Sequence, residues 1–145
     1  MKNLLLILIS LLILSCNNKG INKKNIIGKW KAFDSNIIPF THPSSCKNLD
    51  LNTVLQFDLN GVPKLFPSSK DTNCILYQNY FIKDSLLVFN ELDMQFSYDI
   101  LKLSKDTLII RSSKIPYYVF ETESKKQKQI LETIKKEGII ISFKK

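Results

Sequence analysis

The sequence predicts an all-β fold: an antiparallel meander of eight or nine strands with one late helix. From Gly28 onward, short apolar runs alternate with turn residues, which is typical of antiparallel β proteins. Two segments, Phe81–Val88 and Leu103–Ile110, are near copies in which apolar residues flank a Lys-Asp turn. We interpret them as successive hairpins, because strands adjacent in sequence pair at the lowest loop-entropy cost.

The first strands are predicted from their alternation. Gly28–Phe33 forms a strand with Trp30 on its apolar face, and Thr53–Asp58 places Leu55 and Phe57 opposite its polar positions. The segment that follows, through Asn60-Gly61, is a turn, because Asn and Gly tolerate the positive φ of tight hairpins. The returning strand contains a proline without an N–H, so it must lie at an edge or a bulge of the sheet.

The later elements follow the same logic. Tyr117–Glu121 is a further strand, and Ser124 begins the single helix with Gln127 completing a capping box. Gly138 is placed to end this helix in the left-handed conformation, and Ile139–Phe143 forms a short final strand. The strands expected in the middle of the chain are Cys74–Ile82, Leu86–Phe89, Met94–Leu103 and Thr107–Arg111.

The N-terminus has the parts of a secretory signal. A short positive start precedes Leu4–Leu14, an apolar run of eleven residues, whereas a transmembrane helix needs about 20. The run ends in Ile13-Leu14-Ser15-Cys16, which resembles the lipobox of bacterial lipoproteins, in which the cysteine is acylated and becomes the new N-terminus. The resemblance implies removal of residues 1–15 and lipidation of Cys16. The alternative is an ordinary signal peptide that ends near a cysteine.

Residues 16–25 are expected to form the lipidated cysteine and a flexible tether. The segment is polar and basic, with Lys19, Lys23 and Lys24 and no acidic residue, so it cannot bury enough apolar surface to fold. Its charge favours anionic headgroups near the anchor. Acidic residues after the cysteine, which signal surface export in some bacteria, are absent. By resemblance, this favours a periplasm-facing position in the bacterial cell envelope.

The chain is basic, with 21 Lys and Arg against 13 Asp and Glu. Because an exported protein rarely meets nucleic acid, we expect none as a partner. Solubility or contact with anionic lipid explains the charge better. Much of the excess is at the C-terminus, in Lys125, Lys126, Lys128, Lys135, Lys136, Lys144 and Lys145.

With Cys16 assigned to lipid, Cys46 and Cys74 are an even pair in an oxidising compartment, which predicts a disulfide. A metal site that uses His42 with both sulfurs is the alternative. It lacks an obvious fourth ligand, and paired thiols outside the cytoplasm usually oxidise, so we expect no metal.

Residues 26–145 resemble the lipocalins and bacterial lipocalin-like lipoproteins. The similarity lies in the Gly-x-Trp motif of Ile26–Trp30, in Leu55–Phe57 before Asn60-Gly61, in the Lys-Asp hairpins, and in the late helix with its final strand. It implies an antiparallel up-and-down β-barrel with Trp30 at the closed end and an apolar ligand at the open end. The long loop Asn36–Asn52 has no counterpart that we can match in the family.

The chain offers no defensible catalytic signature, and we expect neither an enzyme nor a cofactor. His42, the single histidine, lies in a Pro-rich loop, and the four glycines are too scattered for a phosphate-binding loop. Asp84 and Asp106 occupy matching hairpin turns, where aspartate is favoured structurally.

Aromatic residues in the strands either form a packed core or line a cavity for a small hydrophobic ligand. Two hypotheses therefore stay open: a binder of an apolar molecule near the membrane, and an interaction or structural lipoprotein whose loops contact another envelope protein. The candidate lining residues are Trp30, Phe57, Tyr77, Phe81, Phe89, Phe96, Tyr98 and Phe120.

Overall fold

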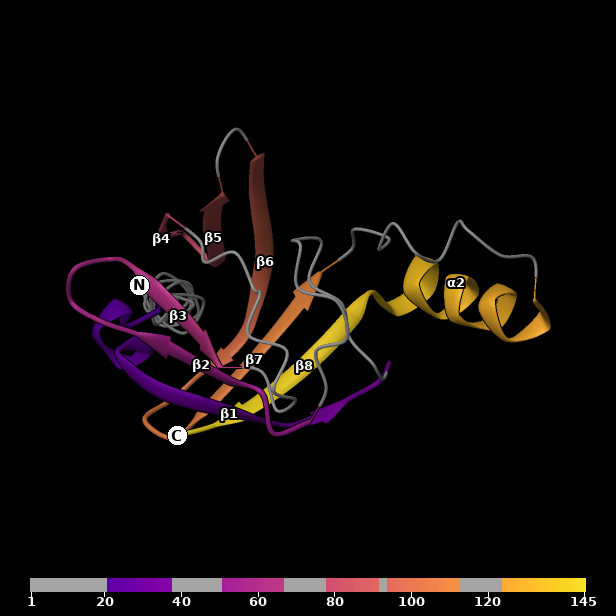
Figure 1. Ribbon diagram of the computed structural model, residues 1–145, viewed down its shortest axis with the longest axis horizontal. Helices are drawn as coiled ribbons and strands as arrows, with labels where there is room; N and C mark the ends of the chain where they lie inside the picture. Colours follow the sequence, from indigo (N-terminus) through magenta and orange to yellow (C-terminus); the bar gives the residue numbers. More distant parts are fainter. Residues whose placement is uncertain (1–20, 38–50, 67–77, 92–93, 113–123) are drawn as a thin grey trace, which may run out of the picture.

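The computed structural model describes residues 21–37, 51–66, 78–91, 94–112 and 124–145. Within these ranges it has eight strands, a 3-10 helix and an α-helix (Figure 1). In chain order they are η1 (Lys23–Ile26), β1 (Gly28–Ser35), β2 (Val54–Phe57), β3 (Pro63–Phe66), β4 (Asn79–Lys83), β5 (Leu86–Glu91), β6 (Met94–Leu103), β7 (Thr107–Ser112), α2 (Lys125–Glu137) and β8 (Ile139–Lys144).

The strands form one antiparallel sheet in the order β3-β2-β1-β8-β7-β6-β5-β4. Strands that are neighbours in sequence pair with each other, apart from β3 and β4. The last strand, β8, pairs with β7 and also with β1. The result is a nearly closed up-and-down barrel with an open seam between β3 and β4. The predicted all-β barrel with a late helix and a final strand is confirmed.

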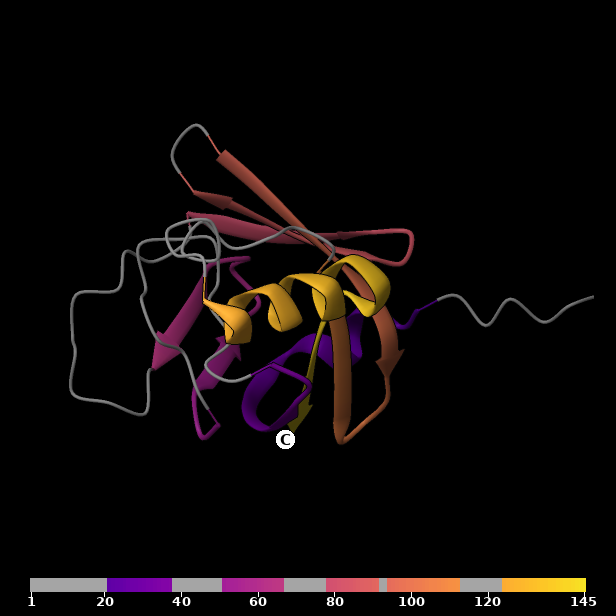
Figure 2. The ribbon, with the colours of Figure 1, turned by 90° about the vertical axis from the view of Figure 1, so that its right-hand side faces the viewer.

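The barrel has two different ends. Because all pairings are antiparallel, β1, β3, β5 and β7 finish at one end, which we call the open end, where α2 also lies (Figures 1 and 2). The opposite end carries η1, the C-terminus and the β2–β3, β4–β5 and β6–β7 turns. We call it the closed end. At the seam, the Tyr80 backbone N–H donates to Gly61 O (2.8 Å) and the Tyr80 hydroxyl donates to Asp58 O (2.7 Å).

The first strands follow the predicted alternation. β1 runs past Phe33 to Ser35, with an irregularity in its pairing to β8 between Ala32 and Asp34. β2 buries Leu55 and Phe57, and β3 lies at the sheet edge, as its proline requires. In the β2–β3 turn it is Gly61 that takes the positive φ, at 75°.

Both Lys-Asp hairpins are confirmed, as β4–β5 and β6–β7. In the first, Asp84 has φ 54°, which fits a tight two-residue turn between Lys83 and Leu86. In the second, the Asp106 carboxylate accepts a hydrogen bond from the Ser104 hydroxyl at 2.8 Å. The described part of β4 begins at Asn79; residues 74–77 and the strand predicted at 117–121 lie outside the described residues.

The helix α2 begins as predicted. The Ser124 hydroxyl accepts from the Gln127 N–H (3.3 Å), and Gln127 Oε1 accepts from the Ser124 N–H (3.2 Å). At its end, Gly138 has φ 75° but ψ −177°, so the predicted left-handed helical conformation is wrong. The reason is that β8 starts at the next residue, which requires an extended ψ. No helix in the described ranges has the length and apolar character needed to cross a membrane.

Candidate functional site

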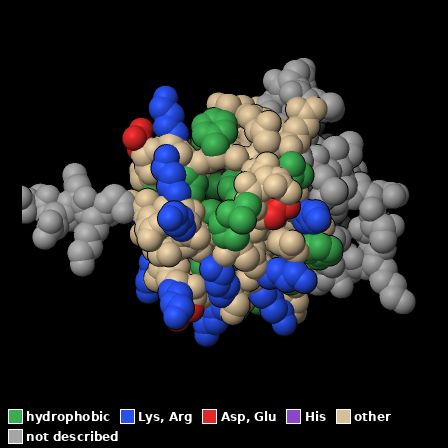
Figure 3. All heavy atoms as spheres, turned by 90° about the vertical axis from the view of Figure 1, so that its left-hand side faces the viewer, with side chains coloured by type: hydrophobic (Ala, Val, Ile, Leu, Met, Phe, Trp, Pro, Cys, Tyr) green, Lys and Arg blue, Asp and Glu red, His purple; other side chains and the backbone are tan. Residues whose placement is uncertain are grey.

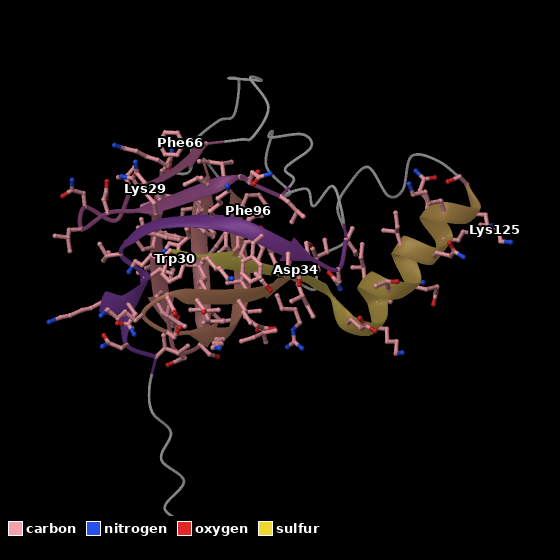
Figure 4. The ribbon with its side chains drawn as sticks, turned by 90° about the horizontal axis from the view of Figure 1, so that it is seen from below. Lys29, Trp30, Asp34, Phe66, Phe96 and Lys125 are labelled. Atoms are coloured by element: carbon pink, nitrogen blue, oxygen red, sulfur yellow. The ribbon has the colours of Figure 1, made fainter. Side chains whose placement is uncertain are left out.

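The closed end is sealed by contacts around Trp30, which is fully buried. Its indole Nε1 donates to Ile26 O in η1 at 2.6 Å. The Lys145 Nζ lies 5.0 Å from the centroid of the indole ring and donates to Asn25 O at 3.1 Å. A Cβ on Gly28, which has φ 132°, would meet Lys145 Cε at 2.5 Å, so glycine leaves room for this lysine. Figure 4 shows Trp30 at the end of the barrel away from α2.

A chain of aromatic rings packs inside the barrel and joins strands on both sides of the seam. Tyr80 on β4 meets Phe57 on β2 edge to face, with centroids 4.7 Å apart. Phe57 stacks on Phe89 of β5 at 6.0 Å, and Phe89 meets Tyr98 of β6 at 5.8 Å. Burial raises the pKa of Tyr98, and partial burial together with the charge of Asp58 raises the pKa of Tyr80.

Inward side chains on four adjacent strands become smaller from the closed end to the open end. β2, β1, β8 and β7 are neighbours in the sheet, and on each the inward residue nearest the open end is smaller than the one nearest the closed end. On these strands the large rings lie toward the closed end, and hydroxyls and one isoleucine lie toward the open end. Ile37, just after β1, and Ile134 of α2 are buried in the same core cluster. From the closed to the open end the inward residues are Phe57 and Leu55 on β2, with Thr53 just before it; Trp30, Ala32 and Ser35 on β1; Phe143, Ile141 and Ile139 on β8; Leu108, Ile110 and Ser112 on β7.

We call the region lined by Ser35, Thr53, Phe96, Ser112 and Ile139 the open-half interior. Phe96, near the open end of β6, is 6 % exposed, and Figure 4 shows it between the strands of the barrel. The region combines an apolar wall with small hydroxyl side chains. Such a surface suits an apolar molecule that carries a polar group.

Thr53 is the distinctive polar residue of this region. Its side chain is 1 % exposed, and its hydroxyl has no hydrogen-bond partner in the described part of the chain. Its carbonyl, in contrast, accepts from the Ala32 N–H at 2.8 Å. A buried hydroxyl without a partner costs about 1–3 kcal/mol, so a ligand group that bonds to it would recover free energy. The hydroxyl of Ser35, in comparison, lies 2.9 Å from each of the Ile37 and Ile140 carbonyl oxygens.

Five of the eight candidate core or lining residues are buried. The five residues Trp30, Phe57, Phe89, Phe96 and Tyr98 are buried in one hydrophobic cluster inside the barrel. This burial is what either a packed core or a ligand-lined interior requires.

Phe81 was predicted in this lining, and that prediction is wrong. Tyr80 and Ile82 face the interior, so the alternation of the strand points Phe81 outward, where it is 40 % exposed. Of the other predicted residues, Tyr77, Phe120, Cys46, Cys74 and Cys16 lie outside the described residues, as does His42.

Sequence reasoning missed Thr53 and Tyr80 as interior residues. Tyr80 could have been assigned from strand alternation alone. Thr53 was recognised as a strand residue, but nothing in its neighbours along the chain indicates that its hydroxyl lacks a partner. Among the described residues, no group of three or more His, Cys, Asp or Glu is placed to hold a metal ion.

Comparison of the chain with protein-family models, with curated proteins and with solved structures finds no match.

Proposed function

We propose that this chain is a lipid-anchored lipoprotein of the bacterial cell envelope whose lipocalin-like barrel binds a small hydrophobic ligand with one polar group. The anchor is Cys16, and binding requires no catalysis or cofactor. The ligand lies in the open-half interior, with its apolar part against Phe96 and Ile139 and its polar group toward Thr53.

The gradient of inward side chains supports this proposal most directly. A barrel of this strand number is only just wide enough for its interior to be filled by side chains or to hold one small ligand. In the closed half, Trp30, Phe57 and Phe143 supply the bulk needed to fill it. In the open half, the inward positions on four adjacent strands carry smaller side chains, and the ligand would pack there beside Ile37 and Ile134 of the same core cluster.

The Thr53 hydroxyl supports a ligand that is amphipathic rather than purely apolar. In an interior made almost entirely of hydrocarbon, an unpartnered buried hydroxyl is unfavourable unless a bound group satisfies it. A long-chain alcohol, an ester or a fatty acid would each offer an oxygen for this bond.

The test is equilibrium binding of a fluorescent fatty acid to the wild-type protein and to Thr53→Val, with unlabelled alcohols, esters and alkanes as competitors. We expect Thr53→Val to weaken binding of the oxygen-bearing ligands by about fivefold, the loss of one hydrogen bond, while alkane competition is unchanged. Thr107→Val is the matched control, since its hydroxyl bonds Asp106 on the outside of the barrel (3.0 Å). Equal binding by all three proteins, or no binding at all, would contradict the proposal.

One observation favours the alternative, an interaction lipoprotein. Phe66 and Phe81 are 46 % and 40 % exposed on β3 and β4, the two strands that border the seam. Edge strands with exposed aromatic residues can pair with a strand of another protein. If this alternative holds, the double variant Phe66→Ser with Phe81→Ser would abolish cross-linking to a defined envelope partner. The ligand-binding proposal predicts that the same double variant still binds fatty acid.

A further inference from the structure

We propose that the closed end of the barrel docks on an anionic lipid bilayer, with Leu59 inserted among the lipids and surrounding lysines on the headgroups. This orientation rests on the proposed lipid anchor for its biological setting. The contact surface itself is argued from residues of the folded domain.

Leu59 lies at the tip of the β2–β3 turn and is 88 % exposed, more than the other exposed large hydrophobic residues of the described chain. The turn projects beyond the end of the barrel, because Phe57 is paired with Gly28, the first residue of β1, on one side and with Pro63 on the other. Val62, at the base of the same turn, is 39 % exposed. An isolated leucine held at the tip of a rigid turn is suited to insertion into a membrane interface.

The turn itself is held firmly. Asp58 Oδ1 accepts from the Asn60 N–H at 3.0 Å and from the Val62 N–H at 3.4 Å. The Tyr80 hydroxyl also bonds Asp58 O, which ties the turn to β4. Leu59 is therefore presented without an ordering cost on docking.

Lysines surround this turn on the closed end. Figure 3, which faces this end, shows hydrophobic side chains bordered on the left and below by many Lys and Arg side chains, with few acidic ones. The ion pairs of the described residues all lie elsewhere, on β6–β7 and on α2, so none of these lysines is neutralised by an acid in the described ranges. The closed-end lysines are Lys23, Lys24, Lys29, Lys64, Lys105 and Lys145.

The acids that do lie near this end are engaged in turns. Asp58 accepts the two backbone bonds described above, and Asp106 accepts from the hydroxyls of Ser104 (2.8 Å) and Thr107 (3.0 Å). These bonds, led by that from Ser104, lower the pKa of Asp106. Asp84, in the β4–β5 turn, is a third acid at this end. Three acids against six lysines leave the surface positive, and each lysine near an anionic surface strengthens binding by about fivefold.

The position of Ile21 at the closed end indicates that the docking partner is a bilayer. Ile21 precedes η1 at the closed end, and five residue steps separate it from Cys16, a reach of at most about 18 Å. A lipid on Cys16 would therefore hold this basic surface close to the headgroups. The open end and α2 would then face the aqueous phase, so ligand would enter from that side.

The test uses the lipidated protein from host membranes, reconstituted in vesicles of phosphatidylcholine and phosphatidylglycerol with brominated acyl chains. We expect the fluorescence of Leu59→Trp to be quenched relative to wild type, whose own Trp30 is buried. Phe66→Trp, on the outer face of β3 toward the open end, should not be quenched. Quenching of both, or of neither, would overturn the proposal.

Charge is tested in the Leu59→Trp background. Lys24→Gln with Lys105→Gln should weaken docking by about 25-fold, and pure phosphatidylcholine vesicles should abolish it. Lys125→Gln with Lys126→Gln on α2, an equal loss of charge at the far end of the molecule (Figure 4), should have no effect. Equal effects of the two pairs would refute docking through the closed end.

The intact mass of the same preparation separates the two proposals. If Cys16 carries no lipid but Leu59→Trp is still quenched, docking stands and the anchor fails. If Cys16 is lipidated and Leu59→Trp is not quenched, the anchor stands and docking fails.

Discussion

Replacing Thr53 by valine should stabilise the ligand-free protein although it weakens ligand binding. The two side chains are β-branched and nearly equal in shape, so strand preference and packing change little. What changes is that the buried hydroxyl, which has no partner in the described part of the chain, becomes a methyl group. Replacing a hydroxyl that has a good hydrogen-bond partner would instead lower the free energy of unfolding.

The magnitude follows from the cost of an unsatisfied buried hydroxyl, about 1–3 kcal/mol. We therefore expect Thr53→Val to raise the free energy of unfolding by about 1 kcal/mol or more. For a domain of this size, 1 kcal/mol corresponds to about 3–6 °C in Tm.

The assay is urea denaturation of the ligand-free protein, followed by circular dichroism, with Thr107→Val as control. Thr107→Val removes a hydroxyl that is bonded to Asp106 and should lower stability. A fall in stability for Thr53→Val as large as that of Thr107→Val would show that the Thr53 hydroxyl has a partner, and would refute the reasoning. Adding a fatty acid should stabilise wild type more than Thr53→Val.

Three further predictions test the packing and the ionisable groups. Phe89→Ala should cost about 3–5 kcal/mol in urea denaturation, whereas the outward Phe81→Ala should cost about 0.5 kcal/mol or less. Burial raises the pKa of Tyr98, so its contribution to stability is complete below about pH 10 and is lost above it, at about 1.4 kcal/mol per pH unit; Tyr98→Phe should flatten this alkaline decline. Hydrogen bonds, led by that from Ser104, lower the pKa of Asp106, so its contribution is present above about pH 3.9 and is lost as pH falls; Asp106→Asn should reduce acid sensitivity in a pH titration of unfolding.

The strands could be predicted from sequence because a two-residue period determines which side chains share a face. Leu55 and Phe57 follow that rule, and so does Phe81, which was assigned to the interior only because it is aromatic and lies in a strand. Its neighbours Tyr80 and Ile82 are the inward residues. Composition indicates that a strand is apolar, but only the register decides which aromatic residues reach the core.

The closure of the barrel and the character of the site depend on contacts that are distant in sequence. β1 pairs with β8, bringing Lys31 opposite Lys144, and the chain end brings Lys145 over Trp30. No local sequence pattern specifies these long-range contacts, although the family resemblance implied the barrel. The missing partner of the Thr53 hydroxyl is likewise a property of the assembled interior.

Native mass spectrometry of the protein extracted from host membranes tests the central claim most directly, because comparison with the denatured mass separates covalent from non-covalent mass. We expect a denatured mass of the chain from Cys16 onward with attached acyl groups, and a native mass larger by one small molecule that is released on unfolding. An unmodified chain would contradict the anchor. Identical native and denatured masses, with no uptake of added fatty acid, alcohol or ester, would contradict ligand binding by the barrel.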